Sequence, residues 1–244
     1  MKSLVFASRN LKEIILDPLM MSFCIGFPVI VLLLLTAIQA NIPVSLFAIG
    51  SLTPGITVFG LSFISLFAGT LLAKDRSTSF LMRLFATPLK ASDFIFGYVL
   101  PVFPIALLQC VVCFGLAIIL GLPLSIHILM ALVALIPTML LFIGCGLLMG
   151  SIFNDKAVGG ISSILVNVAA WLSGAWFDLN LVGGVFKKIG YLLPFAPAVD
   201  AARSALAGDY AAMFPNLWWV IGYAVVTLGL AIVVFRRKMA AGSN

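Results

Sequence analysis

Charged residues are scarce in this sequence, and no polar stretch is long enough to fold as a separate soluble domain. Only 9% of the 244 residues are Asp, Glu, Lys or Arg, whereas 63% are hydrophobic. Soluble globular domains carry about 25% charged residues. The composition excludes an ordinary soluble protein and predicts an all-α integral membrane protein that forms one membrane domain over residues 1–244.

The sequence also lacks the motifs of common hydrolases and ion-driven carriers. It contains no GxxxxGK[ST] phosphate loop, no HExxH and no GxSxG. Its carboxylates stand near the ends of apolar runs, whereas a proton- or sodium-driven carrier usually needs an ionisable residue at mid-depth. We therefore expect no catalytic residue and no cofactor in this chain, and a transporter of this kind must obtain its energy from a partner.

Cysteine and histidine give no evidence for a metal site. Cys110 and Cys113 have CxxC spacing, but no histidine or carboxylate lies near them in sequence. Cys24 and Cys145 also lie in apolar runs, and thiols commonly serve as small buried hydrophobic groups. We interpret all four thiols, and the single histidine His127, as structural.

Six apolar runs are long enough to cross a bilayer, which takes about 20 helical residues. Asp17-Pro18 supplies a cap and a proline at the first helical position before the first run. Glycines in the second run leave room for close approach of a neighbouring helix. The predicted spans are residues 18–39, 54–73, 94–120, 125–152, 157–177 and 215–235.

Two amphipathic segments flank these runs. Residues 3–16 are too short and too charged to span, and we expect them to lie along the membrane surface with Arg9, Lys12 and Glu13 on the polar side. Residues 74–93 form the longest polar interruption between two apolar runs and are closed by Thr87-Pro88, because the residue before a proline resists helix. This second segment is either an interface-lying connector or a docking element for a cytoplasmic partner.

Three features inside or beside the spans could serve a transport path. Phe59, Phe63 and Phe67 recur every four residues, a pattern that packing or lipid contact produces more often than a ligand site. Asn167, followed one turn later by Trp171, lies in the middle of the fifth run, where an amide is costly unless it faces protein or water. Residues 178–214 are too broken by glycine and proline to cross as one helix, so we expect short helices that dip into the outer interface.

The basic residues set the orientation. Eleven of the fourteen lysines and arginines lie on the side that holds both termini, and only Lys187, Lys188 and Arg203 lie on the other. By the positive-inside rule both termini are cytoplasmic. The net charge of +6 sits at the ends of apolar runs rather than on one amphipathic face, so it indicates topology and not binding to nucleic acid.

An ordered set of short motifs accompanies the six spans and the amphipathic first segment. The set comprises Pro54-Gly55, Asp75-Arg76, Arg83-Leu84, Thr87-Pro88-Leu89, Ser173-Gly174, Pro194 and the pair Asp200 and Arg203. Over its whole length the chain resembles the membrane (permease) subunits of the ABC-2 type exporters, also called type V ABC exporters.

The resemblance implies a division of roles. Residues 75–87 would form a coupling helix seated in a groove of a separate ABC ATPase, which would hold ATP and Mg. Two permease subunits, identical or closely related, would pair in the cell membrane and export an amphiphile such as a drug, a lipid, a lipopeptide or a glycan-linked lipid. The implied ATPase-coupling residues are Asp75, Arg76, Phe80, Arg83, Leu84, Thr87, Pro88, Asp155 and Lys156.

The same resemblance assigns residues to the path and the gate. Those of the substrate path or dimer interface would be Phe59, Phe63, Phe67, Asn167 and Trp171. Outer re-entrant helices would carry a gate that includes Pro194, Asp200 and Arg203. A different class also stays open, namely an ATP-independent channel or a membrane-embedded immunity or scaffold protein. Co-purification with an ATPase would separate the two classes.

Overall fold

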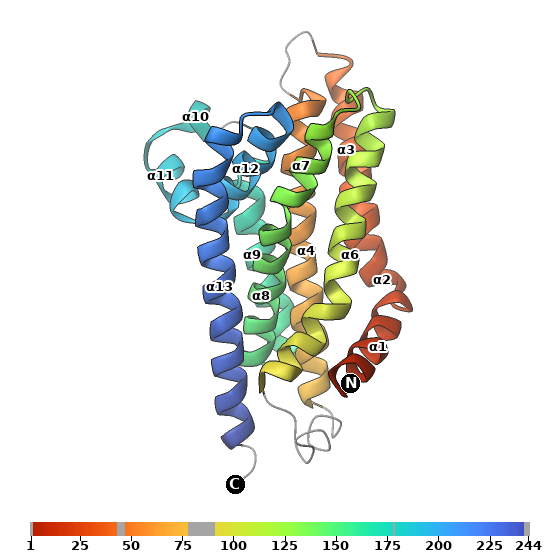
Figure 1. The fold of residues 1–244 in the computed structure, drawn as a ribbon, viewed down its shortest axis with the longest axis vertical. Coiled ribbons are helices and arrows are strands. Elements are labelled where there is room, and N and C mark those ends of the chain that lie inside the picture. The colour runs from red at the N-terminus through yellow and green to blue at the C-terminus, as the bar shows by residue number, and fades with distance from the viewer. Residues whose placement is uncertain (1, 43–46, 78–90, 178, 242–244) are drawn as a thin grey trace.

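The computed structural model describes residues 2–42, 47–77, 91–177 and 179–241, and every regular element within these ranges is a helix (Figure 1). The expectation of an all-helical protein is confirmed. In chain order the elements are α1 (Lys2–Ile15), α2 (Pro18–Met21), the π-helix η1 (Ser22–Gly26), α3 (Phe27–Gln39), α4 (Ile49–Ser77), α6 (Ala91–Ile119), α7 (Ile126–Ala134), α8 (Ile136–Ile152), α9 (Asp155–Leu172), α10 (Leu179–Val182), α11 (Gly184–Leu192), α12 (Phe195–Ala207) and α13 (Tyr210–Ala241).

Five helical stretches in the described ranges are long and apolar enough to cross a membrane. They are Pro18–Gln39, Ile49–Ser77, Ser92–Ile119, Ile126–Ile152 and Tyr210–Lys238. The first has the predicted limits, and the third and fourth agree to within two residues. The second and last extend beyond their predicted starts, because Pro54 and Pro215 lie near the amino ends of α4 and α13 rather than before them.

The predicted fifth span corresponds to α9, which is not among these five stretches. It is 18 residues long, begins with Asp155 and Lys156, and ends at Leu172, five residues before the predicted limit. Residues 173–177 are not helical, and Gly174 has a φ of +67°, a left-handed conformation that ends the helix.

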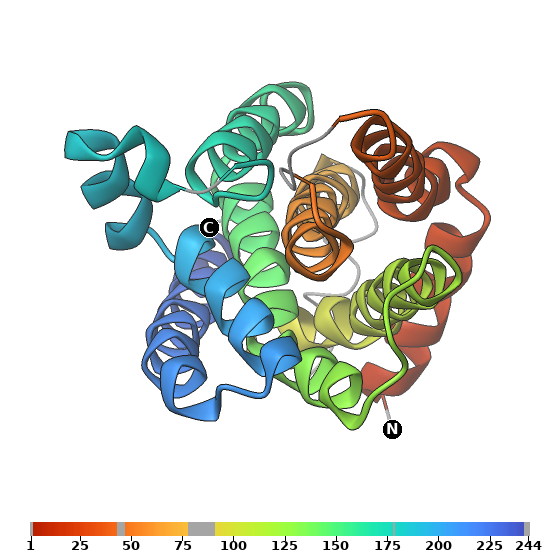
Figure 2. The same cartoon turned by 90° about the horizontal axis from the view of Figure 1, so that it is seen from above.

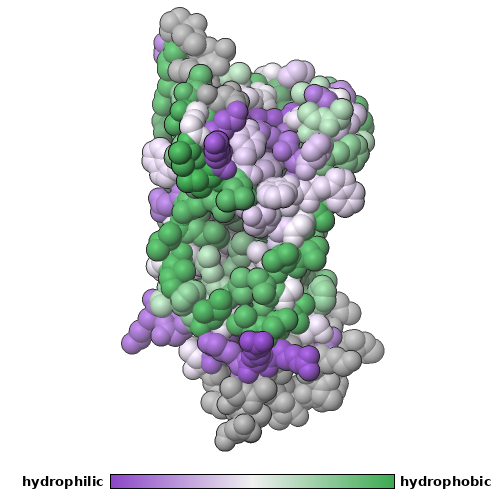
Figure 3. Space-filling model, turned by 90° about the vertical axis from the view of Figure 1, so that its left-hand side faces the viewer, coloured by the Kyte–Doolittle hydropathy of each residue, from purple (hydrophilic) through white to green (hydrophobic). Residues whose placement is uncertain are grey.

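The molecule has two different ends (Figure 1). α1 and the carboxyl end of α13 lie at the lower end, whereas α10, α11 and α12 lie at the upper end. The short upper helices agree with the expectation that residues 178–214 would not form one long helix. Figure 3 shows a band of apolar side chains between a polar zone near the lower end and a mixed zone above.

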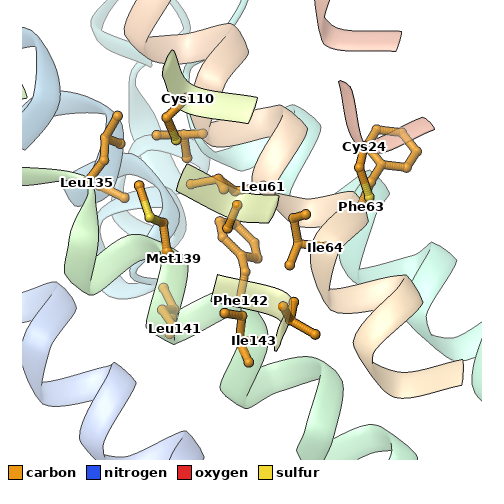
Figure 4. Packing of buried hydrophobic residues seen from close by; sticks show 14 of the residues in the cluster. Cys24, Leu61, Phe63, Ile64, Cys110, Leu135, Met139, Leu141, Phe142 and Ile143 are labelled. Carbon is orange, nitrogen blue, oxygen red and sulfur yellow. The ribbon is translucent and has the colours of Figure 1, made fainter. Parts of the chain in front are cut away.

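Seen from above, α4 occupies the middle of the bundle, and α13 lies beyond α8 (Figure 2). α4 packs against α3, α6, α8, α9 and α12. Side chains from α4, α6 and α8 meet in a continuous apolar core (Figure 4), with Leu61 and Ile64 from α4, Cys110 from α6, and Met139 and Phe142 from α8.

The polar side chains of α4 are satisfied largely within the helix itself. Thr57 Oγ1 donates to the carbonyl oxygen of Thr53 at 2.7 Å, and Ser65 Oγ donates to that of Ser62 at 2.7 Å. Gln109 on α6 donates through Nε2 to the Thr57 carbonyl oxygen at 3.0 Å. These bonds allow a helix with several hydroxyls to sit in an apolar core.

Small residues bring α4 and α8 into backbone contact. A Cβ at Gly150 would lie 2.5 Å from the carbonyl oxygen of Gly69, and one at Gly146 would collide with the backbone of Ser65. This confirms that glycines of the second span permit close helix approach. The partner helix is α8, whose glycines repeat four residues apart.

We predict that Gly146→Ala destabilises the protein by about 1–3 kcal/mol, because the added methyl group meets the Ser65 backbone and not a movable side chain. Unfolding in detergent, followed by circular dichroism during titration with a denaturing detergent, measures the change. Gly115→Ala on α6 is the matched control, since nothing lies within 4 Å of its Cβ position. Equal stability of the two variants would contradict the close contact.

Candidate functional site

At the lower end α1 packs against α6 through aromatic rings. The Phe6 ring lies 5.0 Å from that of Tyr98 in an edge-to-face arrangement, and Gly97 provides the space, because a Cβ there would collide with the Phe6 ring. Ala7 and Ile14 on the same helix are also buried.

A buried carboxylate ties α1 to α4. Asp75 is only 2% exposed, and its two oxygens accept hydrogen bonds from Arg9 Nη1 and Nη2 at 3.0 and 3.1 Å. The hydroxyl of Tyr98 donates to Asp75 Oδ2 at 2.7 Å. Burial alone lowers the pKa of Arg9, but the Asp75 carboxylate outweighs this effect and raises it. Arg9 is therefore charged at all ordinary pH values and holds α1 in place.

This network adds to two expectations. Arg9 lies on the polar side of α1 as expected, with 39% of its side chain exposed, and its guanidinium also reaches Asp75, 66 residues later. The resemblance assigned Asp75 to ATPase coupling, which stays a prediction; in the single chain its carboxylate is enclosed by Arg9 and Tyr98. Glu13 continues the network outward, accepting from Arg9 at 2.9 Å and from Lys74 Nζ at 3.2 Å.

Arg76, the next residue, is engaged on the opposite side of α4. Its Nη1 donates to the carbonyl oxygens of Gly150, Ser151 (2.7 Å) and Phe153 (3.2 Å) at the carboxyl end of α8. Lys238 of α13 donates to the Ile152 carbonyl oxygen at 2.7 Å. Two cations therefore cap the negative end of the α8 dipole, and Arg76 has a structural role that the sequence did not indicate.

Most of the predicted coupling segment lies outside the described residues. This applies to Phe80, Arg83, Leu84, Thr87 and Pro88, whose roles stay predictions. Asp155 and Lys156 are exposed at the amino end of α9, where Asn154 caps the helix by accepting from the Ala157 N–H at 2.9 Å.

The phenylalanine stripe of α4 is buried within the single chain. Phe59 is 5% exposed, and Phe63 and Phe67 are each 9% exposed. The Phe59 ring lies 4.9 Å from that of Trp176, and the Phe63 ring lies 5.2 Å from that of Phe27. The stripe joins α4 to the first span and to the residues after α9, and its role in a path or dimer interface stays a prediction.

α9 presents a row of exposed polar and small side chains instead. The row follows a spacing of four residues through Asp155, Gly159, Ser163, Asn167 and Trp171. Apart from Gly159, which is half-buried, each is exposed in the single chain, and Trp171 is 61% exposed. We call these five residues the α9 ridge.

The amide of Asn167 is the most polar group in the middle of this ridge. Its Nδ2 donates to the carbonyl oxygen of Ser163 at 2.9 Å, in the preceding turn of the same helix. A side chain that bonds only its own helix leaves acceptor capacity at the surface.

The three outer residues assigned by resemblance come together around α12. Pro194 is the residue before the helix, and Asp200 accepts from the Tyr191 hydroxyl at 2.6 Å. Arg203 donates to the carbonyl oxygens of Ser51 at 3.0 Å and Gly174 at 2.9 Å. Arg203 therefore links the start of α4 to the left-handed turn after α9.

Comparisons with known proteins are consistent with this architecture. A family model described as ABC-2 family transporter protein matches residues 43–233, which is well over half of the chain. No curated protein matches the chain.

We predict that Arg76→Glu lowers the free energy of unfolding by about 2–4 kcal/mol, because it removes charge-assisted bonds and places a carboxylate beside the α8 carbonyl oxygens. Stability in detergent and the amount of protein in the membrane report the loss. Arg237→Glu makes the same charge change at an exposed site on α13 and is the control. If both variants are equally stable, the Arg76 cap contributes nothing.

Proposed function

Because the chain belongs to the ABC-2 family of transporter proteins, we propose that it is the permease subunit of an ATP-driven exporter. Two copies, or one copy and a close relative, pair in the cell membrane. A separate ABC ATPase binds ATP and Mg and hydrolyses the nucleotide, so this chain carries no catalytic residue. The family and the five apolar helices already identify a multi-pass membrane protein that acts in transport.

The observation that carries this proposal is the α9 ridge. An exposed amide and hydroxyl in the middle of a bilayer are costly unless they face water or another protein. Asn167 and Ser163 are exposed in the single chain, and each donates to a carbonyl oxygen of its own helix. We therefore assign α9 as the sixth span, with its ridge facing a second subunit and a path between the subunits. The apolar face of α9 packs against α4 and α8, which supports this orientation.

Orientation follows from charge. The lower end carries Arg9, Lys12, Lys74 and the run Arg236–Lys238, and the upper end carries Lys187 and Lys188. A basic end faces the cytoplasm. Both termini then lie on the cytoplasmic side, together with the carboxyl end of α4 and the amino end of α6, which flank residues 78–90 in sequence.

The contacts of Asp75 and Arg76 suggest how an ATPase could transmit movement to the membrane helices. These two residues fasten the end of α4 to α1 and to α8, and residues 78–90 come shortly after them in sequence. An ATPase that displaces this segment would move α1, α4 and α8 as one body, since bidentate and buried charge pairs resist separation. The amphipathic pattern of the segment, with Phe80 and Leu84 opposite Arg83, favours the docking role over a surface connector.

The upper end provides the outer gate in this proposal. α12 contacts the start of α4 through Arg203 and α11 through Tyr191 and Asp200. A movement of α4 would be transmitted to these short helices through the same contacts. The gate would open toward the outside for an amphiphilic substrate.

The proposal predicts that an ABC ATPase encoded beside this chain co-purifies with it, and that Arg83→Glu weakens this association by about 2–5 kcal/mol if the charge is desolvated at the contact. A pull-down beside a vesicle transport assay measures both effects. Lys188→Glu, at the opposite end, is the control. Transport that continues without any ATPase would instead favour an ATP-independent channel or a scaffold protein.

A second prediction concerns the path. Asn167→Leu should change the activation free energy of transport by about 1 kcal/mol, and so the transport rate about fivefold, because it removes a hydrogen-bonding group from the ridge. Dimer formation and expression should stay normal. Ile164→Leu, an exposed apolar change on the same helix, is the control. Unchanged transport of every substrate tested would show that Asn167 only packs helices.

A further inference from the structure

A groove opens at the lower end between the α1–α2 elbow, α4 and the start of α9. Its volume is about 320 Å³, which lies in the range of about 300–1,000 Å³ that small-molecule sites occupy. The floor is apolar and comes from different elements, with Ile14 from α1, Met20 from α2, and Phe67 and Leu71 from α4. We call it the elbow groove.

The rim of the elbow groove carries more negative than positive charge. It carries the carboxylates of Glu13, Asp17 and Asp155 and one cation, Lys74. Glu13 and Lys74 pair with each other at 3.2 Å. Asp17 and Asp155 form no ion pair with any residue that the structure describes. The described rim therefore retains two uncompensated negative charges above an apolar floor.

Each uncompensated carboxylate is held in place by its local structure. Asp17 caps α2, with Oδ1 accepting from the N–H groups of Leu19 and Met20 at 3.0 Å each. Asp155 occupies the first position of α9, where the positive end of the helix dipole favours an anion. These local contacts hold both carboxylates at the mouth of the groove.

The edge of the groove is apolar and open. Leu19, which lines the groove, is 61% exposed, and Leu16, three residues earlier, is 79% exposed. In the orientation proposed above, this apolar edge lies at the cytoplasmic surface of the membrane. A molecule dissolved in the membrane surface can therefore reach the groove sideways.

We propose that the elbow groove binds the substrate before export, and that the substrate class is an apolar molecule with a delocalised or fully alkylated cationic group. This deepens the function proposed above and rests on it. The apolar body covers Met20, Phe67 and Leu71, while the cation lies between Asp17 and Asp155. A neutral lipid leaves both carboxylates uncompensated, and an anionic lipid is repelled by them.

The kind of cation follows from the cost of desolvation. A compact ammonium ion is strongly hydrated, whereas a charge spread over alkyl or aryl groups leaves water readily and can also lie on an aromatic ring. Phe67 provides such a ring in the floor. The α9 ridge leads upward from the groove, since Asp155 both lines the groove and begins the ridge.

The test uses two probes of nearly the same shape and opposite charge, tetraphenylphosphonium and tetraphenylborate. The full-length chain is placed in nanodiscs of phosphatidylcholine, and binding is measured by equilibrium dialysis against empty nanodiscs. We expect saturable binding of the cation at least about tenfold tighter than of the anion, because two carboxylates face the bound charge. Equal affinity for the two probes, or no saturable binding, overturns the proposal.

Variants locate the site. Asp17→Asn with Asp155→Asn preserves side-chain volume and the capping oxygen, and should weaken binding of the cation at least about tenfold. Thr70→Trp fills the groove from α4 without changing a charge and should abolish binding. Asp209→Asn removes a capping carboxylate at the upper end and should have no effect. Binding that survives both groove variants, or that Asp209→Asn weakens as strongly, overturns the assignment.

The binding assay contains neither ATP nor an ATPase, so its outcome is independent of the pull-down described above. Binding of the cation without association of an ATPase would retain the groove and reject the exporter. Association of an ATPase without binding of the cation would retain the exporter and reject this substrate class.

Discussion

The absence of water from the bilayer core is the constraint on which the rest of this structure depends. Every buried polar group must then find a partner inside the protein. α4 meets this requirement with hydroxyls that bond to its own carbonyl oxygens, and with glycines that bring the backbone of α8 within contact. Because the hydroxyl groups of α4 are hydrogen-bonded within the helix, it can occupy the middle of the bundle, where α3, α6, α8, α9 and α12 pack against it.

The same constraint is resolved differently where α4 reaches the lower end. Asp75 and Arg76 are adjacent in sequence but point to opposite sides of the helix, one to Arg9 and Tyr98 and the other to the carboxyl end of α8. A carboxylate enclosed by a guanidinium and a hydroxyl, and a guanidinium on a helix terminus, are both strongly directional. Two neighbouring residues thus fix three helices at the lower end of the bundle.

Much of this fold could be predicted from the sequence, because a bilayer span demands an apolar run whose length is known. The amphipathic pattern of residues 3–16 placed Arg9 on the polar side, where its side chain is partly exposed. The pattern could not show that the guanidinium also binds Asp75, because this buried counter-charge lies 66 residues away in sequence. The phenylalanine stripe shows the same limit, since periodicity reports a shared face but not whether that face meets its own chain or another.

α9 is the element on which these lines converge. The sequence predicted a span over residues 157–177, but the helix itself starts earlier, with two charged residues, and carries an amide at its middle, so it is less apolar than the five other long stretches. A helix that bordered only lipid would gain nothing from Ser163 and Asn167, whereas a helix that borders a hydrated path or a second subunit requires such groups. The composition of α9 therefore supports the path proposed above. Because the ridge starts at Asp155 in the elbow groove and ends at Trp171 near the outer helices, one helix connects the cytoplasmic and outer ends of the proposed path.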